Sequence, residues 1–447
     1  MSKVELVRSH LQDFGMAANV ILNQNIKKQI KAGKSVHAFG FGQSPFPVME
    51  EAIEALREHA EENEYVPVAG IPLLRQAISD FHFRYDKIRF SPDNIIVGPG
   101  SKELIYALVN VFGGDILVIS PSWTTYKPQT QLANQRCVVL NTTAEDEWRV
   151  TPEIVEKAME DKTLSKYKLL ILCNPDNPTG THYTEEHLAD LTEVFRKHNI
   201  LVLSDEIYGR LCFNHKHVCM SKVYPEGAVI STGLSKCASV GGWRVGYHVF
   251  PDELKTLKDA VECVGSNTNS CACTPVQYAL AKMLNCEEKF DQYLNHTTRI
   301  MAKAGDYAYK ELTAAGVEAV KPYGGYYLFP DFGILKPALA KRGITTGNKM
   351  CEAMFKEKSI VLMAGGPAFL RPESELTTRL CYVNFDGKKA LQKSREIGLD
   401  KPLPEDFIKE QCSPLYHGIQ AIVSWALKTT PPVVTFSTPA KRELEIS

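Results

Sequence analysis

Five short apolar runs through the middle of the chain constrain its fold more than any other feature. Each run is rich in Ile, Leu and Val, and the runs cover residues 94–97, 115–120, 168–173, 200–204 and 228–231. Continuous apolar strands of this kind are typical of a sheet that is buried on both faces. Between two of them, an apolar stripe at helical spacing follows Thr184, a good N-cap residue. This βαβ pattern predicts an α/β fold with a mostly parallel central sheet flanked by helices.

The pattern changes from about Phe290 onward, where helical segments surround shorter strand candidates at 326–329 and 379–383. We predict an N-terminal segment (1–45) that packs on a small domain, a large domain (46–288), and a small C-terminal domain with an extended tail (289–447). Residues 414–427 have an apolar helical pattern, which predicts a packed terminal helix or, alternatively, a helix that binds a partner. The Pro- and Thr-rich tail from Thr429 is expected to be irregular.

The charge balance and the cysteines argue against several classes of function. Lys plus Arg (51) and Asp plus Glu (52) leave a net charge of −1, so we expect no nucleic acid and no membrane partner. No run approaches the roughly 18 apolar residues of a membrane span, and the first residues lack the apolar stretch of a signal peptide. The 12 Cys lack paired CxxC spacing, which predicts buried thiols and no metal site. We expect a soluble, cytoplasmic protein.

Ligands of open parallel sheets bind at the carboxyl ends of the strands, so the loops after the apolar runs form the candidate site. The turn 98–103 opens a helix, where Gly100, Ser101 and Lys102 can present N–H groups to phosphate, although such a turn is also common punctuation. Trp123 follows the second run and either stacks on a planar ligand or belongs to the core. Both loops are therefore candidates for binding a phosphorylated ring.

The next two loops add polar side chains. Asn177 lies within Asn-Pro-Asp-Asn-Pro-Thr-Gly (174–180), which is either a double turn or a source of an amide for a ligand oxygen. Asp205 and Tyr208 place a carboxylate and a phenol close together after the fourth run, where a solvated loop is the alternative interpretation.

The fifth run leads into Ser235 and Lys236, and Arg244 follows eight residues after the lysine. A lysine alone is an ordinary surface residue. The order of phosphate turn, aromatic residue, Asn-Pro-Thr-Gly, Asp-x-x-Tyr, Ser-Lys and Arg resembles fold-type I aminotransferases dependent on pyridoxal phosphate (PLP), the class I/II members of the aspartate aminotransferase superfamily. The match runs from about Gly40 to Asn384. It implies the PLP-dependent transferase fold of type I, with a smaller α+β domain built from the N-terminal segment and the C-terminal part.

The resemblance implies a role for each matched position. Lys236 would hold PLP as a Schiff base and shuttle a proton between substrate and cofactor carbons. Asp205 would face the pyridine nitrogen and keep it protonated. Asn177 and Tyr208 would hydrogen-bond the 3′ oxygen of the ring. Ring stacking and phosphate binding would fall to Trp123, Arg244, the turn Gly100 to Lys102, and Ser235.

Two distant segments complete the resemblance. Tyr65 matches a residue that reaches the phosphate of the neighbouring subunit, which implies a homodimer with shared active sites. Arg379 matches the residue that grips the substrate α-carboxylate, although an outward Arg on an alternating strand is the alternative interpretation. Gly42 resembles a glycine where substrate approaches the backbone, and a plain turn is its alternative. Trp123 and Asn177 would also contact substrate.

The match departs from the family in three places. Gln43-Ser44 stands where the family often has Glu-Pro, which bears on the shape of the substrate pocket. Gly233 stands where a serine often lies three residues before the lysine, so one phosphate hydroxyl is absent. Residues 364–369 stand where many members have a Pro-Gly-Ser turn.

These residues together predict a PLP-dependent transaminase that moves an amino group between an L-amino acid and a 2-oxo acid by ping-pong half-reactions. The alternative enzyme is a PLP-dependent C–S β-lyase of the cysteine-conjugate type, because the lysine and ring machinery serve both reactions. A non-catalytic PLP-binding regulator is the alternative outside enzymes. The sequence does not select the amino donor, and we identify no cation placed for an acidic substrate side chain.

Overall fold

The computed structural model describes residues 6–12, 14–213 and 217–429. Within them, a central sheet has the strand order β2-β8-β7-β6-β5-β3-β4. β8 runs antiparallel to both of its neighbours, β2 and β7, and all the other pairs in this sheet are parallel. The predicted mostly parallel sheet is therefore confirmed. Its strands are β2 (Ile95–Gly98), β3 (Asp115–Ser120), β4 (Cys137–Asn141), β5 (Lys168–Cys173), β6 (Ile200–Asp205), β7 (Ala228–Gly233) and β8 (Gly246–Val249).

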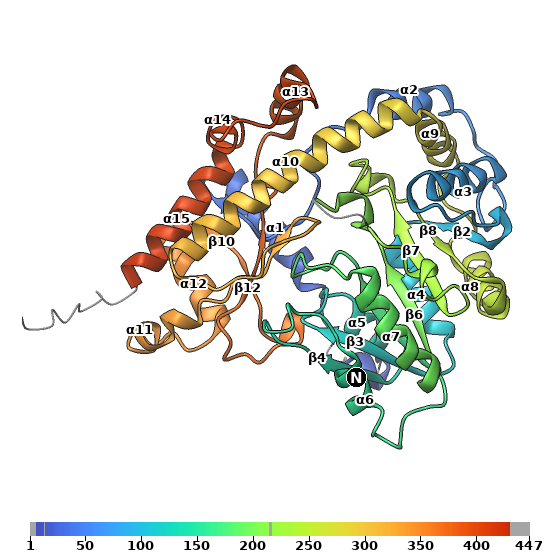
Figure 1. The fold of residues 1–447 in the computed structure, drawn as a ribbon, viewed down its shortest axis with the longest axis horizontal. Coiled ribbons are helices and arrows are strands. Elements are labelled where there is room, and N and C mark those ends of the chain that lie inside the picture. The colour runs from blue at the N-terminus through green and yellow to red at the C-terminus, as the bar shows by residue number, and fades with distance from the viewer. Residues whose placement is uncertain (1–5, 13, 214–216, 430–447) are drawn as a thin grey trace, which may run out of the picture.

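Helices flank this sheet and connect its parallel strands (Figure 1). The apolar stripe after Thr184 forms α7 (Glu185–His198), whose first turn is capped because Thr184 Oγ1 accepts a hydrogen bond from His187 N at 3.3 Å. Leu188 and Phe195 on that stripe are fully buried. The other helices of this part are α2 (Glu50–Glu58), α3 (Pro72–Asp86), α4 (Ser101–Val111), α5 (Tyr126–Leu132), α6 (Pro152–Ala158), α8 (Lys255–Thr268) and α9 (Thr274–Asn285).

The long helix α10 (Glu287–Ala314) extends from the region of α9 to the C-terminal part of the chain, where it lies beside α15 (Figure 1). The helices there are α11 (Lys336–Ala340), α12 (Gly347–Lys358), α13 (Gly387–Ile397), α14 (Phe407–Gln411) and α15 (Ser413–Thr429). The predicted boundary at 288/289 falls in the first turn of α10, and the three-part division of the chain stays a prediction.

Two small sheets join distant segments in this region. β1 (His37–Ala38) pairs in parallel with β10 (Ile360–Val361), which places the N-terminal segment beside the C-terminal part. The second sheet has the order β11-β12-β9 and is antiparallel. Its strands are β11 (Met363–Ala364), β12 (Thr378–Cys381) and β9 (Tyr327–Leu328). The last two strands are shorter than the sequence pattern predicts.

The terminal helix α15 packs with a buried apolar face against its neighbours. Ile419, Ile422 and Trp425 are buried, which confirms the predicted packed helix, whereas Leu427 at its end is half exposed. The irregular tail predicted beyond Thr429 lies outside the described residues. Among the helices of residues 6–12, 14–213 and 217–429, none combines the length and the apolar character needed to cross a bilayer.

Candidate active site

A cavity of about 520 Å³ lies where the carboxyl ends of β3, β5, β6 and β7 meet the segment 41–44 and the small antiparallel sheet. Residues from all the predicted loops line it. The sequence-predicted residues on its wall are Gly42, Ser101, Lys102, Trp123, Asn177, Asp205, Tyr208, Ser235, Lys236, Arg244 and Arg379. The backbone of Gly100 lies close to the guanidinium of Arg244. Tyr65 does not line this cavity, and its side chain is 88% exposed.

Lys236 follows β7 and its amine lies inside the cavity. Nζ donates a hydrogen bond to the carbonyl of Gly42 at 3.0 Å, and the Tyr326 hydroxyl donates to the carbonyl of Lys236 at 2.8 Å. Burial, together with the nearby guanidinium groups, lowers the pKa of Lys236 to about 8. The amine is therefore unprotonated in a larger fraction of molecules at neutral pH than an ordinary lysine, as a nucleophile or base requires.

Asp205 ends β6 and is fully buried. Its Oδ2 accepts a 2.6 Å hydrogen bond from the Tyr126 hydroxyl, and its Oδ1 accepts from Ile207 N at 3.2 Å. Burial raises the pKa of Asp205 to about 6, and the Tyr126 hydroxyl opposes that rise. Among the described residues, no cation lies within ion-pair distance of this carboxylate. Asp205 is thus suited to stabilise a positively charged group that enters the cavity.

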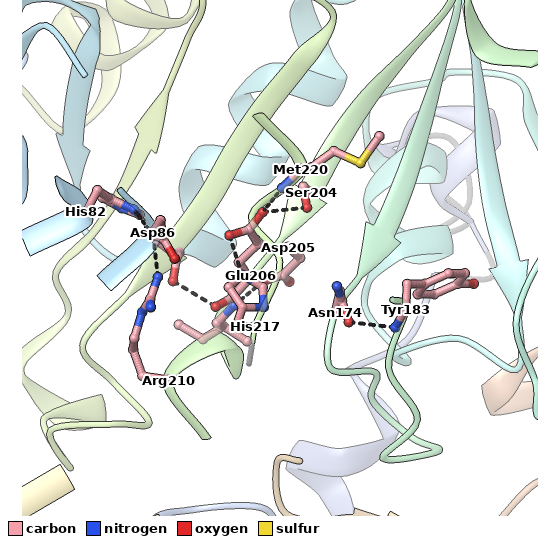
Figure 2. Close-up of polar contacts among 12 residues, drawn as sticks. His82, Asp86, Asn174, Tyr183, Ser204, Asp205, Glu206, Arg210, His217 and Met220 are labelled. Carbon is pink, nitrogen blue, oxygen red and sulfur yellow. Dashed lines mark hydrogen bonds and ion pairs between the residues drawn. The ribbon is translucent and has the colours of Figure 1, made fainter. Parts of the chain in front are cut away.

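A buried polar network lies behind Asp205, so the solvated-loop interpretation of these acids is wrong (Figure 2). Glu206 pairs with His217 at 2.6 Å and accepts hydrogen bonds from the Ser204 hydroxyl and from Met220 N. The carboxylate raises the pKa of His217 and the imidazolium lowers that of Glu206, although burial opposes both shifts. A second cluster joins Asp86 to His82 and Arg210. The contacts of Glu206 hold the residue that directly follows Asp205 at the end of β6.

One wall of the cavity is aromatic. Trp123 is partly exposed to the cavity rather than fully buried in the core, and Lys102 Nζ lies 5.0 Å from its ring centroid. Burial and the charge of Arg244 lower the pKa of Lys102. Tyr126 meets Trp123 edge-on, with centroids 5.2 Å apart. A flat indole beside a lysine ammonium suits a planar, negatively charged ligand.

The turn before α4 and Arg244 form a cationic pocket at one end of the cavity. Gly100 has φ of +97°, and a Cβ at this position would lie 2.2 Å from Arg244 Nη2. Glycine is therefore required for the guanidinium to approach the turn. Arg244 donates to the carbonyls of Gly241 and Pro99 at 3.0 and 3.2 Å. Because α4 begins at Ser101, its N-terminal N–H groups and the guanidinium can bind the same anion.

Arg379 on β12 is 1% exposed, so the interpretation of this residue as an outward strand arginine is wrong. Nη2 donates to the Gly40 carbonyl at 2.8 Å and Nη1 to Asn177 Oδ1 at 3.3 Å. Its guanidinium carbon lies 4.8 and 5.4 Å from the ring centroids of Tyr327 and Phe369. Within the described part of the chain, Arg379 Nε is buried and makes no hydrogen bond. A guanidinium held in this way can receive a planar carboxylate.

Sequence reasoning missed Tyr126 and Tyr327. The Tyr327 hydroxyl lies 2.8 Å from that of Tyr208, and a Cβ on Gly42 would lie 2.1 Å from the same Tyr327 oxygen. Gly42 is therefore a point where the Tyr327 side chain approaches the backbone closely, and the approach of substrate there stays a prediction. Tyr126 lies three residues after Trp123 at the start of α5, and that position in a predicted ligand loop was the available signal.

Residues 34–388 match the family described as aminotransferase class I and II. The chain belongs to this family. An aspartate aminotransferase of Geobacillus stearothermophilus is 31% identical over 379 residues. The matched region covers 82% of the chain described here and 91% of the Geobacillus protein. An asparagine–oxo-acid transaminase of Streptococcus mutans is 29% identical over 375 residues, covering 79% and 89%. Among solved structures, an aspartate aminotransferase from Thermus thermophilus with maleate has a TM-score of 0.77 at 26% identity, covering 87% and 98%.

These similarities confirm a fold-type I, PLP-dependent transaminase, as the sequence predicts. The residues of the cavity also fit PLP. Asp205 is a buried carboxylate that lies beyond ion-pair distance of any cation in the described residues, as a protonated ring nitrogen requires of its partner. The turn at Gly100 leaves room for Arg244 beside a helix N-terminus, as a phosphate requires. Lys236 supplies a primary amine with a lowered pKa.

Proposed function

We propose that the cavity holds PLP. Arg244, Ser101 and Ser235 would bind its phosphate, and Trp123 would stack on its ring. Lys102 supports the phosphate through its charge. Support comes from the single cavity that these side chains share and from the approach of Lys102 to both Trp123 and Arg244. When bound, PLP supplies a ring that withdraws electrons from the substrate Cα.

The chain's own polar groups then tune and use that ring. Asp205 keeps the ring nitrogen protonated, and Tyr126 keeps Asp205 ionised by donating to it. Asn177 and Tyr208 bind the ring oxygen, for which both side chains lie on the cavity wall. Lys236 Nζ would hold the cofactor through its aldehyde, and as a free, unprotonated amine it would take the proton from the substrate Cα. A pKa of about 8 suits both tasks near neutral pH.

Arg379 binds the α-carboxylate that every amino-acid substrate and every 2-oxo acid shares. Gly40 and Asn177 hold its guanidinium in place, and the rings of Tyr327 and Phe369 exclude water from it. The observation that carries the proposal is the meeting of Lys236, Asp205 and Arg379 in one cavity. Transamination requires all three groups together: an amine to hold the cofactor, an anion for the cofactor ring and a cation for the substrate carboxylate.

The experiment is a panel of amino acids mixed singly with the PLP-loaded protein, followed by absorbance and by assay of the oxo-acid product. Aspartate is the first donor to test because the relatives are named for it. Conversion to the 2-oxo acid with loss of the PLP absorbance supports the proposal. Release of pyruvate and ammonia from a β-substituted amino acid, without any oxo-acid acceptor, would instead identify the β-lyase.

We also propose a homodimer in which Tyr65 reaches the phosphate site of the neighbouring subunit. Tyr65 is 88% exposed and Leu73 nearby is 51% exposed, which suits a surface covered by a second copy. Mixing Lys236→Ala and Tyr65→Ala subunits tests this, since each mixed dimer then has one site with both native residues. Activity above either parent variant supports sharing, and activity equal to the sum of the parents contradicts it.

The cytoplasmic location and the division into residues 1–45, 46–288 and 289–447 remain part of the proposal. The pairing of β1 with β10 supports the packing of the N-terminal segment on the C-terminal part. Fractionation of cells that express the full chain tests the location. Limited proteolysis with cuts near 45 and 288 tests the division.

A further inference from the structure

A chain of hydroxyl groups connects the loop after β7 to the segment that closes the cavity. Ser44 Oγ lies 2.5 Å from Ser239 Oγ, and Ser239 Oγ lies 2.7 Å from the Tyr293 hydroxyl. That hydroxyl donates to the carbonyl of Pro47 at 2.9 Å. Three segments that are far apart in sequence, at 44–47, at 239 and on α10, are therefore joined by consecutive hydrogen bonds.

The protons of this chain can point in only one direction. The Pro47 carbonyl can only accept, so the single hydroxyl proton of Tyr293 is committed to it. The Tyr293 oxygen must then accept from Ser239, and the Ser239 oxygen must accept from Ser44. Every hydroxyl proton has a partner. Removing Ser239 or Tyr293 leaves the preceding hydroxyl without its acceptor, and removing Ser44 leaves the Ser239 oxygen without its donor. The three hydroxyl groups therefore act as a unit.

The same two segments meet at a second point, which involves the amine. Lys236 Nζ donates to the Gly42 carbonyl, while Ser239, three residues later, binds Ser44. The Tyr326 hydroxyl holds the Lys236 carbonyl between these contacts. When the amine leaves the Gly42 carbonyl to react, the Ser44–Ser239 hydrogen bond still holds the loop after β7, which carries Lys236 and is called the lysine loop below, against the segment 42–44.

The backbone at Ser239 indicates that tertiary contacts hold the lysine loop in this arrangement. Ser239 has φ of +61°, a left-handed conformation that is unfavourable for a residue other than glycine. Tyr293 is 1% exposed on the long helix α10, so the far end of the hydroxyl chain is buried in the core. Ser44 stands where the family often has proline, which has no hydroxyl to donate. The departure at this position thus supplies the first donor of the chain.

We propose that Ser44, Ser239 and Tyr293 are positioning residues that hold Lys236 where it transfers the substrate proton. The proposal rests on the function proposed above for Lys236. The hydroxyl groups of these three residues would not touch the reacting atoms. Their effect is on how long the free amine stays within reach of the substrate Cα, and proton transfer falls steeply as that geometry loosens.

The test uses the PLP-loaded full chain with Tyr293→Phe, Ser239→Ala and the double variant. Each single substitution is expected to lower kcat about fivefold with little change in KM, because one net hydrogen bond is worth about that factor. The double variant is expected to lose no more than the single ones, since either change breaks the same chain. A donor deuterated at Cα should show a larger isotope effect on kcat in the variants, because proton transfer becomes more limiting.

A second readout does not depend on activity. In the full chain freed of PLP, the pH at which trinitrobenzenesulfonate modifies Lys236 half-maximally, measured by peptide mass, should lie near 8 in the native protein. It should move upward in Tyr293→Phe and Ser239→Ala, because a loosened amine reaches more water. Ser44→Thr, which keeps a hydroxyl, should behave like the native chain, whereas Ser44→Ala should behave like the other variants.

Tyr307→Phe is the matched control, since Tyr307 lies on the same helix and its hydroxyl accepts from Gln420, away from the lysine loop. Native kcat, isotope effect and modification pH in both single variants would overturn the proposal, as would a lower Tm without change in these three readouts. If borohydride fails to fix PLP on Lys236 in the native chain, the proposed function itself fails. A native adduct with unaffected variants refutes only the positioning role.

Discussion

The substitution Arg379→Lys tests substrate recognition most sharply, because it keeps the positive charge and removes the planar fork. In the native chain the Gly40 carbonyl and Asn177 Oδ1 fix the guanidinium, whose buried Nε is unpaired among the described residues. A lysine ammonium is a point charge that cannot make two parallel hydrogen bonds to a carboxylate. One hydrogen bond to a charged group is worth about 1.5–3 kcal/mol. A loss of about 3 kcal/mol corresponds to roughly a 150-fold fall in kcat/KM.

The assay is kcat/KM for several amino donors with the native chain and with Arg379→Lys. The loss should be similar for every donor, because all share the α-carboxylate. An amine that lacks this carboxylate should react with PLP equally slowly in both proteins. Arg299→Lys is the control, since Arg299 also binds backbone carbonyls but does not line the cavity. Native kcat/KM in Arg379→Lys, or an equal loss with the carboxylate-free amine, would refute the reasoning.

Three further predictions concern the acids and their partners. Asp205→Ala should still bind PLP but lose on the order of 100-fold or more in kcat, because the buried counter-charge of the ring is gone; near-native kcat would contradict this role. Tyr126→Phe should shift the acid limb of the pH profile of kcat upward by about one unit, because the Tyr126 hydroxyl holds the pKa of Asp205 down; an unchanged limb would exclude the effect. Glu206 raises the pKa of His217 from 6.5 to about 10, so the stability that this pair adds is complete below about pH 6.5 and is lost as pH rises through 10. The Tm difference between the native chain and Glu206→Gln should therefore shrink over that range, and a constant difference would argue against a protonated His217.

Much of the fold follows from the apolar runs, because strands that are buried on both faces leave a strong and local signal. β5, for example, covers the predicted residues 168–173. The site residues that sequence reasoning found all lie in loops directly after such strands or in recognisable family motifs. Tyr327 was missed because its contact with Tyr208 spans 119 residues and depends on how the small sheet meets the large one. No pattern within either segment encodes that approach.

The loop at 364–369 and the Ser44 position show the same limit of local reasoning. Phe369 reaches Arg379 only through the fold, so the absence of the usual Pro-Gly-Ser turn gave no indication of what replaces it. The sequence identifies Ser44 only as a departure from the family. The structure shows that its hydroxyl is hydrogen-bonded to Ser239. Hydrogen bonds between distant side chains depend on tertiary packing, which propensity and spacing do not determine.

The central claim is that the amine of Lys236 carries PLP, and chemical trapping tests it most directly. The PLP-loaded chain is reduced with borohydride and digested, and the peptide that carries the pyridoxyl mass is sequenced. We predict that the modified residue is Lys236 in the native chain and that Lys236→Ala yields no modified active-site peptide. A pyridoxyl group on another lysine, or none on either protein, would contradict the account.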